Sequence, residues 1–207
     1  MKKKLLSWIF FPYSLILESF GFWKDYNVSV YIAVLGIRST GKTTLQNYFR
    51  NIKGPTYSTQ YGGEDQEEIV IVKGTKKVRI KKGKDISGGK ESLRDFSEDE
   101  IGKSNIIFFL YDASRFCKES EYQKEVSAFL IVVCRINRGK RPIHLIGTHI
   151  DKIVINLLNE IKSEIIKYLN SVFIQRGTTL EISCKSISFI DLTNPTDLNS
   201  LKDKLFN

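Results

Sequence analysis

A loop near residue 40 has the residue types and spacing of a phosphate-binding site. Residues 36–43 read Gly-Ile-Arg-Ser-Thr-Gly-Lys-Thr. Glycine at positions 36 and 41 lets the backbone curl, so that successive N–H groups converge on phosphate oxygens. Lys42 would reach the β- and γ-phosphates of a nucleotide as a point charge, and the Thr43 hydroxyl would ligate Mg²⁺. The spacing therefore predicts a nucleotide-phosphate site.

The segments on either side of this loop give the spacing its meaning. Residues 28–35 are a β-branched apolar run typical of one buried strand, and residues 44–50 suit a helix whose positive N-terminal end would face the phosphates. A strand, a glycine-rich loop and a helix in this order are the context that such a motif requires. The predicted nucleotide-binding residues here are Gly36, Ser39, Thr40, Gly41, Lys42, Thr43 and Thr44. The alternative is a strand-to-helix turn that is rich in glycine by chance.

Length and charge set limits on the rest of the molecule. The chain has 207 residues, which is one ordinary domain with room for a short appendage, and a formal net charge of +9. Its three cysteines lack metal-ligand spacing and are expected to be reduced thiols in a cytoplasmic protein. Such a charge favours acidic partners, and an anionic membrane ranks above nucleic acid, because no aromatic residues alternate with the basic runs. Simple solubility is the plainer explanation of the charge.

The N-terminal segment, residues 1–24, differs from the domain predicted at 25–207. Three lysines at positions 2–4 precede an apolar, aromatic run, which Pro12 and Glu18 interrupt. No small-residue cleavage site follows, and the unbroken apolar part is too short to span a bilayer, so neither export nor a membrane span is expected. Two interpretations stay open. The segment is an amphipathic anchor on the cytosolic face of a membrane, or it docks on its own domain or on a partner.

Further along the chain, strand and helix patterns alternate. Strands are predicted at 67–73, 76–80, 105–112, 142–147 and 179–183, and helices near 97–102, around Tyr122 to Val133, from Val154 to Val172 and around Leu198 to Leu205. This alternation predicts an α/β fold with a doubly wound, mostly parallel sheet. The turn at Gly74 predicts one antiparallel strand. Ligands bind such sheets at the carboxyl ends of the strands.

Five motifs in order resemble the Ras-like small GTPase superfamily. They are residues 36–43, a loop threonine, Asp-Ile-Ser-Gly at 85–88, Thr-His-Ile-Asp at 148–151 and Ser-Cys-Lys at 183–185. The resemblance covers roughly residues 28–206. Some features look most like ADP-ribosylation-factor proteins and others like Roc domains. The resemblance to the superfamily implies a three-layer P-loop NTPase fold. Its sheet would have six mostly parallel strands, one of them antiparallel, with helices on both faces.

The resemblance also implies guanine recognition. Asp151 would accept hydrogen bonds from the guanine N1–H and 2-amino groups, while Ser183, the Cys184 N–H and Lys185 would line the base from the other side. Thr148 and His149 replace the family's usual Asn and Lys, which suggests weaker nucleotide binding. The alternative role for Asp151 is that of a helix N-cap.

Magnesium and the γ-phosphate would be held by residues in two loops that the resemblance identifies as switches, about 53–66 and 85–97. Asp85 would hold Mg²⁺ through water, the Gly88 N–H would bind the γ-phosphate, and Thr56 would sense it and ligate Mg²⁺, with Thr59 as the alternative. Catalysis would depend on Lys42, Thr56, Gly88 and Arg38. The loops would also bind a protein effector or regulator.

Three departures from the family concern the mechanism. Gly89 and then Lys90 stand where the family's water-orienting glutamine is expected, which predicts slow GTP hydrolysis. Arg38 lies inside the loop, where relatives carry a small or acidic residue. Lysines interrupt the strand leading to Asp85, so it is expected to end near Ile80. The sequence therefore predicts a GTP- and Mg²⁺-dependent switch with weak GTPase activity, and the alternative is a pseudo-GTPase that serves as an interaction module.

Overall fold

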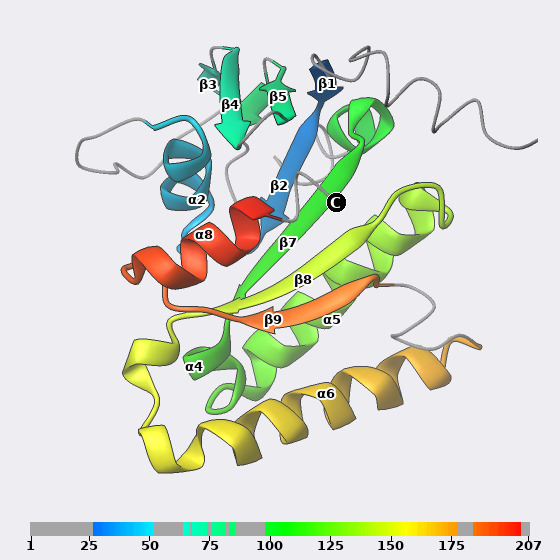
Figure 1. Ribbon diagram of the computed structural model, residues 1–207. Coiled ribbons are helices and arrows are strands. Elements are labelled where there is room, and N and C mark those ends of the chain that lie inside the picture. The colour runs from blue at the N-terminus through cyan, green and yellow to red at the C-terminus, as the bar shows by residue number, and fades with distance from the viewer. Residues whose placement is uncertain are drawn as a thin grey trace, which may run out of the picture.

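The computed structural model describes residues 27–51, 64–66, 68–73, 76–81, 83–85, 98–177 and 184–203. These residues form an α/β fold, in which strands and helices alternate along the chain (Figure 1). The predicted segment at 1–24 lies outside the described residues. Within the described ranges, no helix combines the length and the apolar composition that a membrane span requires.

The described elements follow the predicted order, with additions. The strands are β1 (Asn27–Val30), β2 (Ile32–Gly36), β3 (Glu64–Gln66), β4 (Ile69–Lys73), β5 (Lys76–Ile80), β6 (Gly83–Asp85), β7 (Ile106–Asp112), β8 (Ile143–Thr148) and β9 (Ser186–Phe189). The helices are α2 (Lys42–Phe49), α4 (Ala113–Phe116), α5 (Ser120–Asn137), α6 (Leu158–Ile174) and α8 (Pro195–Asp203), with the short 3₁₀ helices η2 (Ile150–Lys152) and η3 (Ile155–Leu157). Residues 98–103 are also helical.

A four-stranded, all-parallel sheet in the order β2-β7-β8-β9 forms the centre of the fold. Every residue of β2, β7 and β8 is buried, because both faces of this sheet are covered. The register pairs Leu35 with Phe109 and Tyr111 with Gly147. The carboxyl ends of β2, β7 and β8 therefore meet at one edge, next to residues 37–41, 113–116 and 149–152.

The strand predicted at 28–35 is not continuous. It divides at Tyr31 into β1, which pairs with β5, and β2, which pairs with β7. The Tyr31 N–H donates to the Asn105 side chain at 2.8 Å, and the Tyr31 carbonyl accepts from the Asn105 N–H at 2.7 Å. Because these bonds replace regular ladder bonds, the chain changes partner here, and β1-β5-β4 forms a separate three-stranded sheet.

The predicted hairpin at Gly74 is confirmed by the antiparallel pairing of β4 with β5, although the turn itself lies outside the described residues. The expected end of β5 at Ile80 is also confirmed. Residues 64–66, predicted as part of a loop, instead form β3, which pairs antiparallel with β6 and sets Glu64 opposite Asp85. This correction follows from backbone pairing that a polar sequence does not reveal.

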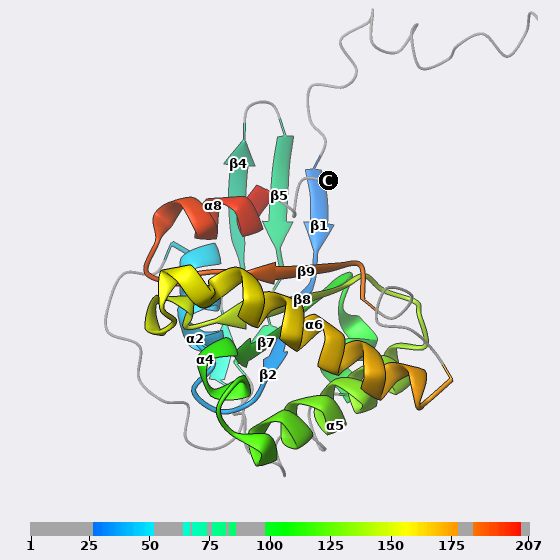
Figure 2. The same cartoon turned by 90° about the horizontal axis from the view of Figure 1, so that it is seen from below.

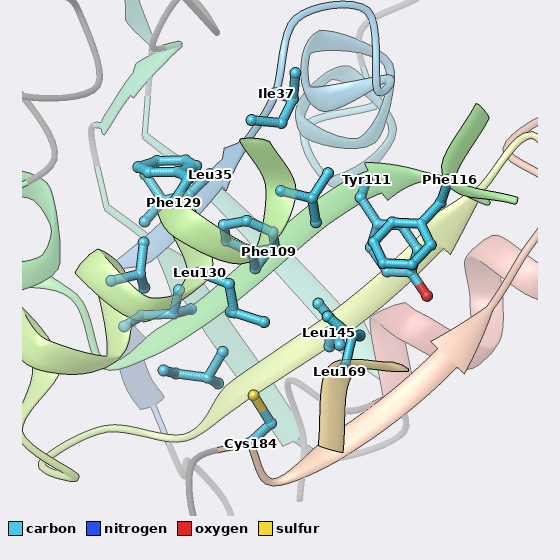
Figure 3. Packing of buried hydrophobic residues seen from close by; sticks show 14 of the residues in the cluster. Leu35, Ile37, Phe109, Tyr111, Phe116, Phe129, Leu130, Leu145, Leu169 and Cys184 are labelled. Carbon is cyan, nitrogen blue, oxygen red and sulfur yellow. The ribbon is translucent and has the colours of Figure 1, made fainter. Parts of the chain in front are cut away.

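Helices cover both faces of the four-stranded sheet (Figure 2). On one face, α5 and α6 bury Val126, Leu130 and Leu169 against Phe109 and Leu145 (Figure 3). On the other face, α2 and α8 pack against alternate residues of the strands. The helices contribute Leu45, Phe49, Leu198 and Leu201, and the strands contribute Val34, Phe108, Leu110 and Ile146. The predicted helical spacing is confirmed in α5, where the apolar residues Tyr122, Val126, Phe129, Leu130 and Val133 are all buried.

Two boundaries differ from the prediction. Helix α6 begins at Leu158, and Val154 before it is 66% exposed, so the apolar spacing extends beyond the helix. A final parallel strand is present at β9, after Cys184, and it was not predicted there. The strand predicted at 179–183 lies outside the described part of the chain.

Candidate functional site

The loop after β2 is held in a curled form by glycine at its start and end. Gly36 has φ 147°, and a Cβ at this position would lie 2.1 Å from the Leu110 carbonyl oxygen. Ser39 and Gly41 have φ values of 63° and 84°, in the left-handed region. Left-handed residues in a glycine-rich loop turn N–H groups toward one concave side, which is the shape of an anion-binding nest.

Lys42 and Thr40 close this loop upon itself. The Lys42 ammonium donates to the Ile37 carbonyl at 2.9 Å, and the Thr40 hydroxyl donates to the same oxygen at 2.8 Å. Both side chains are buried. The ammonium group is therefore kept inside the loop rather than in solvent, where it can meet an anion that enters.

Helix α2 begins at the end of this loop and favours an anion there. Gly41 is its N-cap, and no side chain caps the helix. No acidic residue is present in its first turn, so the positive end of the helix is not offset by a carboxylate. Thr43 and Thr44, both half-buried, lie in this first turn.

Thr148, at the end of β8, ties the loop to the sheet. Its hydroxyl is 3.1 Å from the carbonyl oxygen of Thr40 and 3.1 Å from that of Tyr111, and the residue is fully buried. Because the hydroxyl has one hydrogen, the two carbonyl groups share it. Thr148 is therefore a positioning residue for the loop.

His149 makes a second tether next to the first. Its Nε2 lies 3.0 Å from the Ser39 carbonyl oxygen and 3.8 Å from Asp112 Oδ2. A carbonyl can only accept, so Nε2 carries a hydrogen in this bond. His149 has φ 57°, and this left-handed turn directs the chain from β8 into η2.

Asp112 holds a buried carboxylate behind His149. Its Oδ1 accepts from the Ser114 hydroxyl at 2.7 Å and from the Arg115 N–H at 3.0 Å, and its own N–H donates to the Tyr122 hydroxyl at 2.9 Å. Burial raises the pKa of Tyr122, so this phenol stays protonated. Asp112 was predicted only as the end of a strand, although a polar residue at the carboxyl end of a buried strand is a signal for a site.

Asp151 lies in η2 with an exposed side chain. It is not a helix N-cap, since that position belongs to His149 and no side-chain capping bond is present. The carboxylate is two residues from the His149 tether to the loop. Its exposure leaves it accessible to a ligand bound beside the loop.

Cys184 and Lys185 are not brought together with Asp151. The Lys185 N–H donates to the Ile143 carbonyl at 2.7 Å, at the beginning of β8, whereas Thr148 is the last residue of β8 and His149 follows it. At about 3.3 Å per residue these ends are ~16 Å apart. Cys184 is buried in the core, well away from Ile37 of the loop (Figure 3). The predicted role of this pair at the base is therefore not supported by their position, and Ser183 lies outside the described residues.

The segment after β9 reaches the loop instead. The Ile190 N–H donates to the Gly147 carbonyl at 2.9 Å, which sets this segment next to Thr148. A Cβ at Gly41 would lie 2.1 Å from Leu192 Cδ1, so the Leu192 side chain lies directly on the loop. No sequence pattern indicated Leu192, because it belongs to no apolar period.

The predicted magnesium ligands are partly described. Strand β6, which ends at Asp85, lies against β2 and against α2, the helix whose first turn contains Thr43. Hydroxyl and carboxylate oxygens are the hard donors that Mg²⁺ prefers, so these residue types fit the ion. Within the described ranges, no group of three or more histidine, cysteine or carboxylate residues forms a metal cluster.

The remaining predicted residues divide into two groups. Arg38 is exposed on the loop. Thr56, Thr59, Gly88, Gly89 and Lys90 lie outside the described residues, so their predicted roles stay predictions.

No protein-family model matches the chain. A search of curated proteins likewise finds no match.

Proposed function

We propose that this chain is a guanine-nucleotide-binding switch that hydrolyses GTP slowly. The observation that carries the proposal is the closed loop at residues 37–41, with the buried Lys42 ammonium inside it and the uncapped N-terminus of α2 at its end. A diphosphate would replace the Ile37 carbonyl as the partner of Lys42. A turn that is rich in glycine by chance would not explain why a cation is buried inside it, because burying a charge is costly without a partner of opposite charge.

Strand order also supports the proposal. If β1 and β2 are taken as one strand interrupted at Tyr31, the two sheets give the order β4-β5-β1/β2-β7-β8-β9, with β4 antiparallel. This is the six-stranded arrangement that the Ras-like resemblance implies. The loop at 37–41 follows a central strand of this order, at the carboxyl end where sheets of this kind bind ligands.

The positions of the described residues favour a different pair of contacts with the guanine base from the pair that the resemblance implies. Asp151 would read the guanine N1–H and 2-amino groups, and the segment after β9, with Leu192, would take the place proposed earlier for Cys184 and Lys185. Adenine lacks an N1–H and a 2-amino group, so a carboxylate here selects guanine. Thr148 and His149 would hold the loop in shape rather than contact the base.

Bound Mg²⁺ would neutralise the phosphate oxygens, with Thr43 and Asp85 as its protein ligands. Strand β6 ends at Asp85 and lies against α2. Binding of the metal at Asp85 would therefore directly affect the conformation of the backbone that follows it. Turnover is expected to be slow, because Gly89 and Lys90 cannot orient a water molecule as a glutamine amide does. The lack of a glutamine at this position also favours the second candidate, a nucleotide-bound interaction module that does not hydrolyse GTP.

The test is to denature the purified chain, identify the released nucleotide by HPLC, and then follow GTP turnover with Mg²⁺. We expect GDP or GTP and a slow release of phosphate. Bound ATP would contradict guanine selection, and bound guanine nucleotide without turnover would select the second candidate. Lys42→Ala should abolish nucleotide retention, and retention by this variant would show that the phosphate site is elsewhere.

A further inference from the structure

Basic residues gather at the edge of the sheet where the parallel strands begin. Helix α5 ends at Asn137, and the turn that leads into β8 carries Arg138, Lys140 and Arg141. Lys185 joins them, because its N–H donates to the Ile143 carbonyl at the first residue of β8. The residues Arg138, Lys140 and Lys185 are exposed.

The turn is rigid, so these charges have fixed positions. The side chain of Asn137, which is buried, donates to the Arg141 carbonyl at 2.8 Å and accepts from the Arg141 N–H at 3.1 Å. The Arg141 guanidinium is occupied, since it donates to the Ser104 carbonyl at 2.5 Å and to the Gly102 carbonyl. Arg141 therefore holds the turn to the end of the helix at 98–103, while its neighbours face solvent.

Within the described residues, Arg138, Lys140 and Lys185 form no ion pair with an acidic residue. Residues 126–150 and 165–180 contain no aspartate or glutamate. On the helix at 98–103, Asp99 pairs with Lys103 and Glu100 accepts from the Tyr31 hydroxyl, which leaves only the exposed Glu98. The C-terminal dipole of α5 amounts to about half a charge, which is less than the cations on this turn carry.

The end of α6 extends the positive edge and adds an apolar side chain. Both α5 and α6 end on the side where the strands begin (Figure 1). Arg135 and Arg176, near these two ends, are exposed, and Ile174 is 64% exposed. An aliphatic side chain beside arginine suits the boundary between lipid headgroups and acyl chains.

We propose that this basic edge, defined as Arg135, Arg138, Lys140, Arg176 and Lys185, docks on an anionic phospholipid surface. Strand β1 leads into β2, so the chain enters the fold at Asn27 on this same edge. The sequence before it carries three lysines and an apolar aromatic run. Stable attachment to a bilayer takes two signals, and an apolar segment in the same chain as a polybasic patch supplies both.

Charge and composition distinguish lipid from nucleic acid. Single-stranded nucleic acid is held by aromatic side chains on which bases stack. Residues 135–141, 174–177 and 185 contain no aromatic residue. The edge also lies at the opposite ends of the strands from the loop at 37–41, so docking leaves the nucleotide site open and turned away from the bilayer.

The test compares two full-length variants that lose the same charge. Arg138→Gln/Lys140→Gln/Lys185→Gln removes three cations from the basic edge, and Lys81→Gln/Lys118→Gln/Lys167→Gln removes three exposed cations elsewhere. Binding is measured by co-sedimentation with vesicles of phosphatidylcholine mixed with phosphatidylserine, and with phosphatidylcholine alone. Thermal unfolding and nucleotide content are measured alongside, and we expect them to match in the two variants.

The basic-edge variant should bind the anionic vesicles roughly 10- to 100-fold more weakly than the parent chain, because each cation near the surface contributes about 1 kcal/mol. The control variant should lose much less, and binding of the parent chain should fall as salt rises from about 0.1 to about 1 M. Equal losses in both variants, or none in the basic-edge variant, would overturn the proposal. Binding of the parent chain to single-stranded RNA but not to anionic vesicles would overturn it as well.

Discussion

The Thr148 hydroxyl donates to the Thr40 carbonyl oxygen across 3.1 Å, between residues that are 108 positions apart in the sequence. This bond fixes the loop at 37–41 to the end of β8, and the adjacent His149–Ser39 contact at 3.0 Å repeats the connection. The loop is therefore shaped from two sides, by its own glycines and by the neighbouring strand.

Replacing Thr148 by valine should weaken both the fold and the candidate site. Valine keeps the shape of the side chain but leaves the Thr40 and Tyr111 carbonyl groups without this buried donor. We expect a loss of about 1–3 kcal/mol in the free energy of unfolding, measured in urea. Nucleotide should also dissociate faster. Thr148→Ser keeps the hydroxyl, so slow dissociation in the valine variant and fast dissociation in the serine variant would contradict the role given to this bond.

Gly36→Ala should be far more damaging than an alanine at another glycine with positive φ. A Cβ at Gly36 would lie 2.1 Å from the Leu110 carbonyl, inside the β2–β7 ladder, whereas Gly139, with φ 68°, has no atom within 4 Å of such a Cβ. Overpacking and backbone strain together should cost about 3 kcal/mol or more at Gly36, against about 1 kcal/mol for strain alone at Gly139. Thermal unfolding of both variants checks this, and equal losses would refute the close approach.

Asp151→Asn should change the choice of base, if the proposed function holds. The variant loses a carboxylate that would accept two hydrogen bonds from guanine, and we expect GDP to bind about 100-fold more weakly, as charged hydrogen bonds contribute about 1.5–3 kcal/mol each. Xanthosine diphosphate, with a carbonyl in place of the 2-amino group, should bind the variant better than GDP does. Calorimetric titration with both nucleotides measures this, and Lys152→Gln is the control for an exposed neighbour in η2.

Tyr111→Phe should stabilise the protein. The Tyr111 hydroxyl is buried and has no hydrogen-bond partner within the described part of the chain, so its removal relieves an unsatisfied polar group. We expect a gain of about 1 kcal/mol in urea unfolding at neutral pH. Tyr122→Phe is the matched comparison and should lose stability, because its hydroxyl accepts from the Asp112 N–H at 2.9 Å.

Alkaline pH should unfold the chain in a way that depends on these tyrosines. Burial raises the pKa of Tyr31, Tyr111 and Tyr122 above that of a free phenol. A raised pKa in the folded state means that the stabilisation is complete below the unfolded value of about 10 and is lost as the pH rises above it. Unfolding free energies measured from about pH 9 to about pH 11 should fall steeply for the parent chain and less for Tyr111→Phe. Identical slopes would show that Tyr111 does not titrate with unfolding.

Local patterns were sufficient for most elements of the fold. The apolar spacing of Tyr122, Val126 and Leu130 predicted α5, and the continuous apolar run before Asp112 predicted β7, because burial on one helix face or on both strand faces requires such patterns. The end of β5 at Ile80 was also predicted, since charged residues interrupt the apolar alternation there.

Strand β9 was not predictable in the same way. Its residues, Ser-Ile-Ser-Phe, are half-buried and carry no continuous apolar run. The strand forms because β8 offers unpaired N–H and C=O groups along its outer edge, with His144 paired to Ser186 and Gly147 to Phe189. Polar and apolar residues alternate in β9 over only four positions, which is too short a pattern to predict a strand without the pairing that β8 provides.

By itself the sequence determined the loop at 36–43, the order of helices and strands, and the class of the fold, since these depend on residue types and spacing over a few neighbours. Only the tertiary structure decided that Lys185 lies at the start of β8 while Leu192 lies on Gly41. It also decided that Asp112, Thr148 and His149 brace the loop. These relations depend on parallel pairing between strands far apart in the chain, where register and direction decide which ends meet.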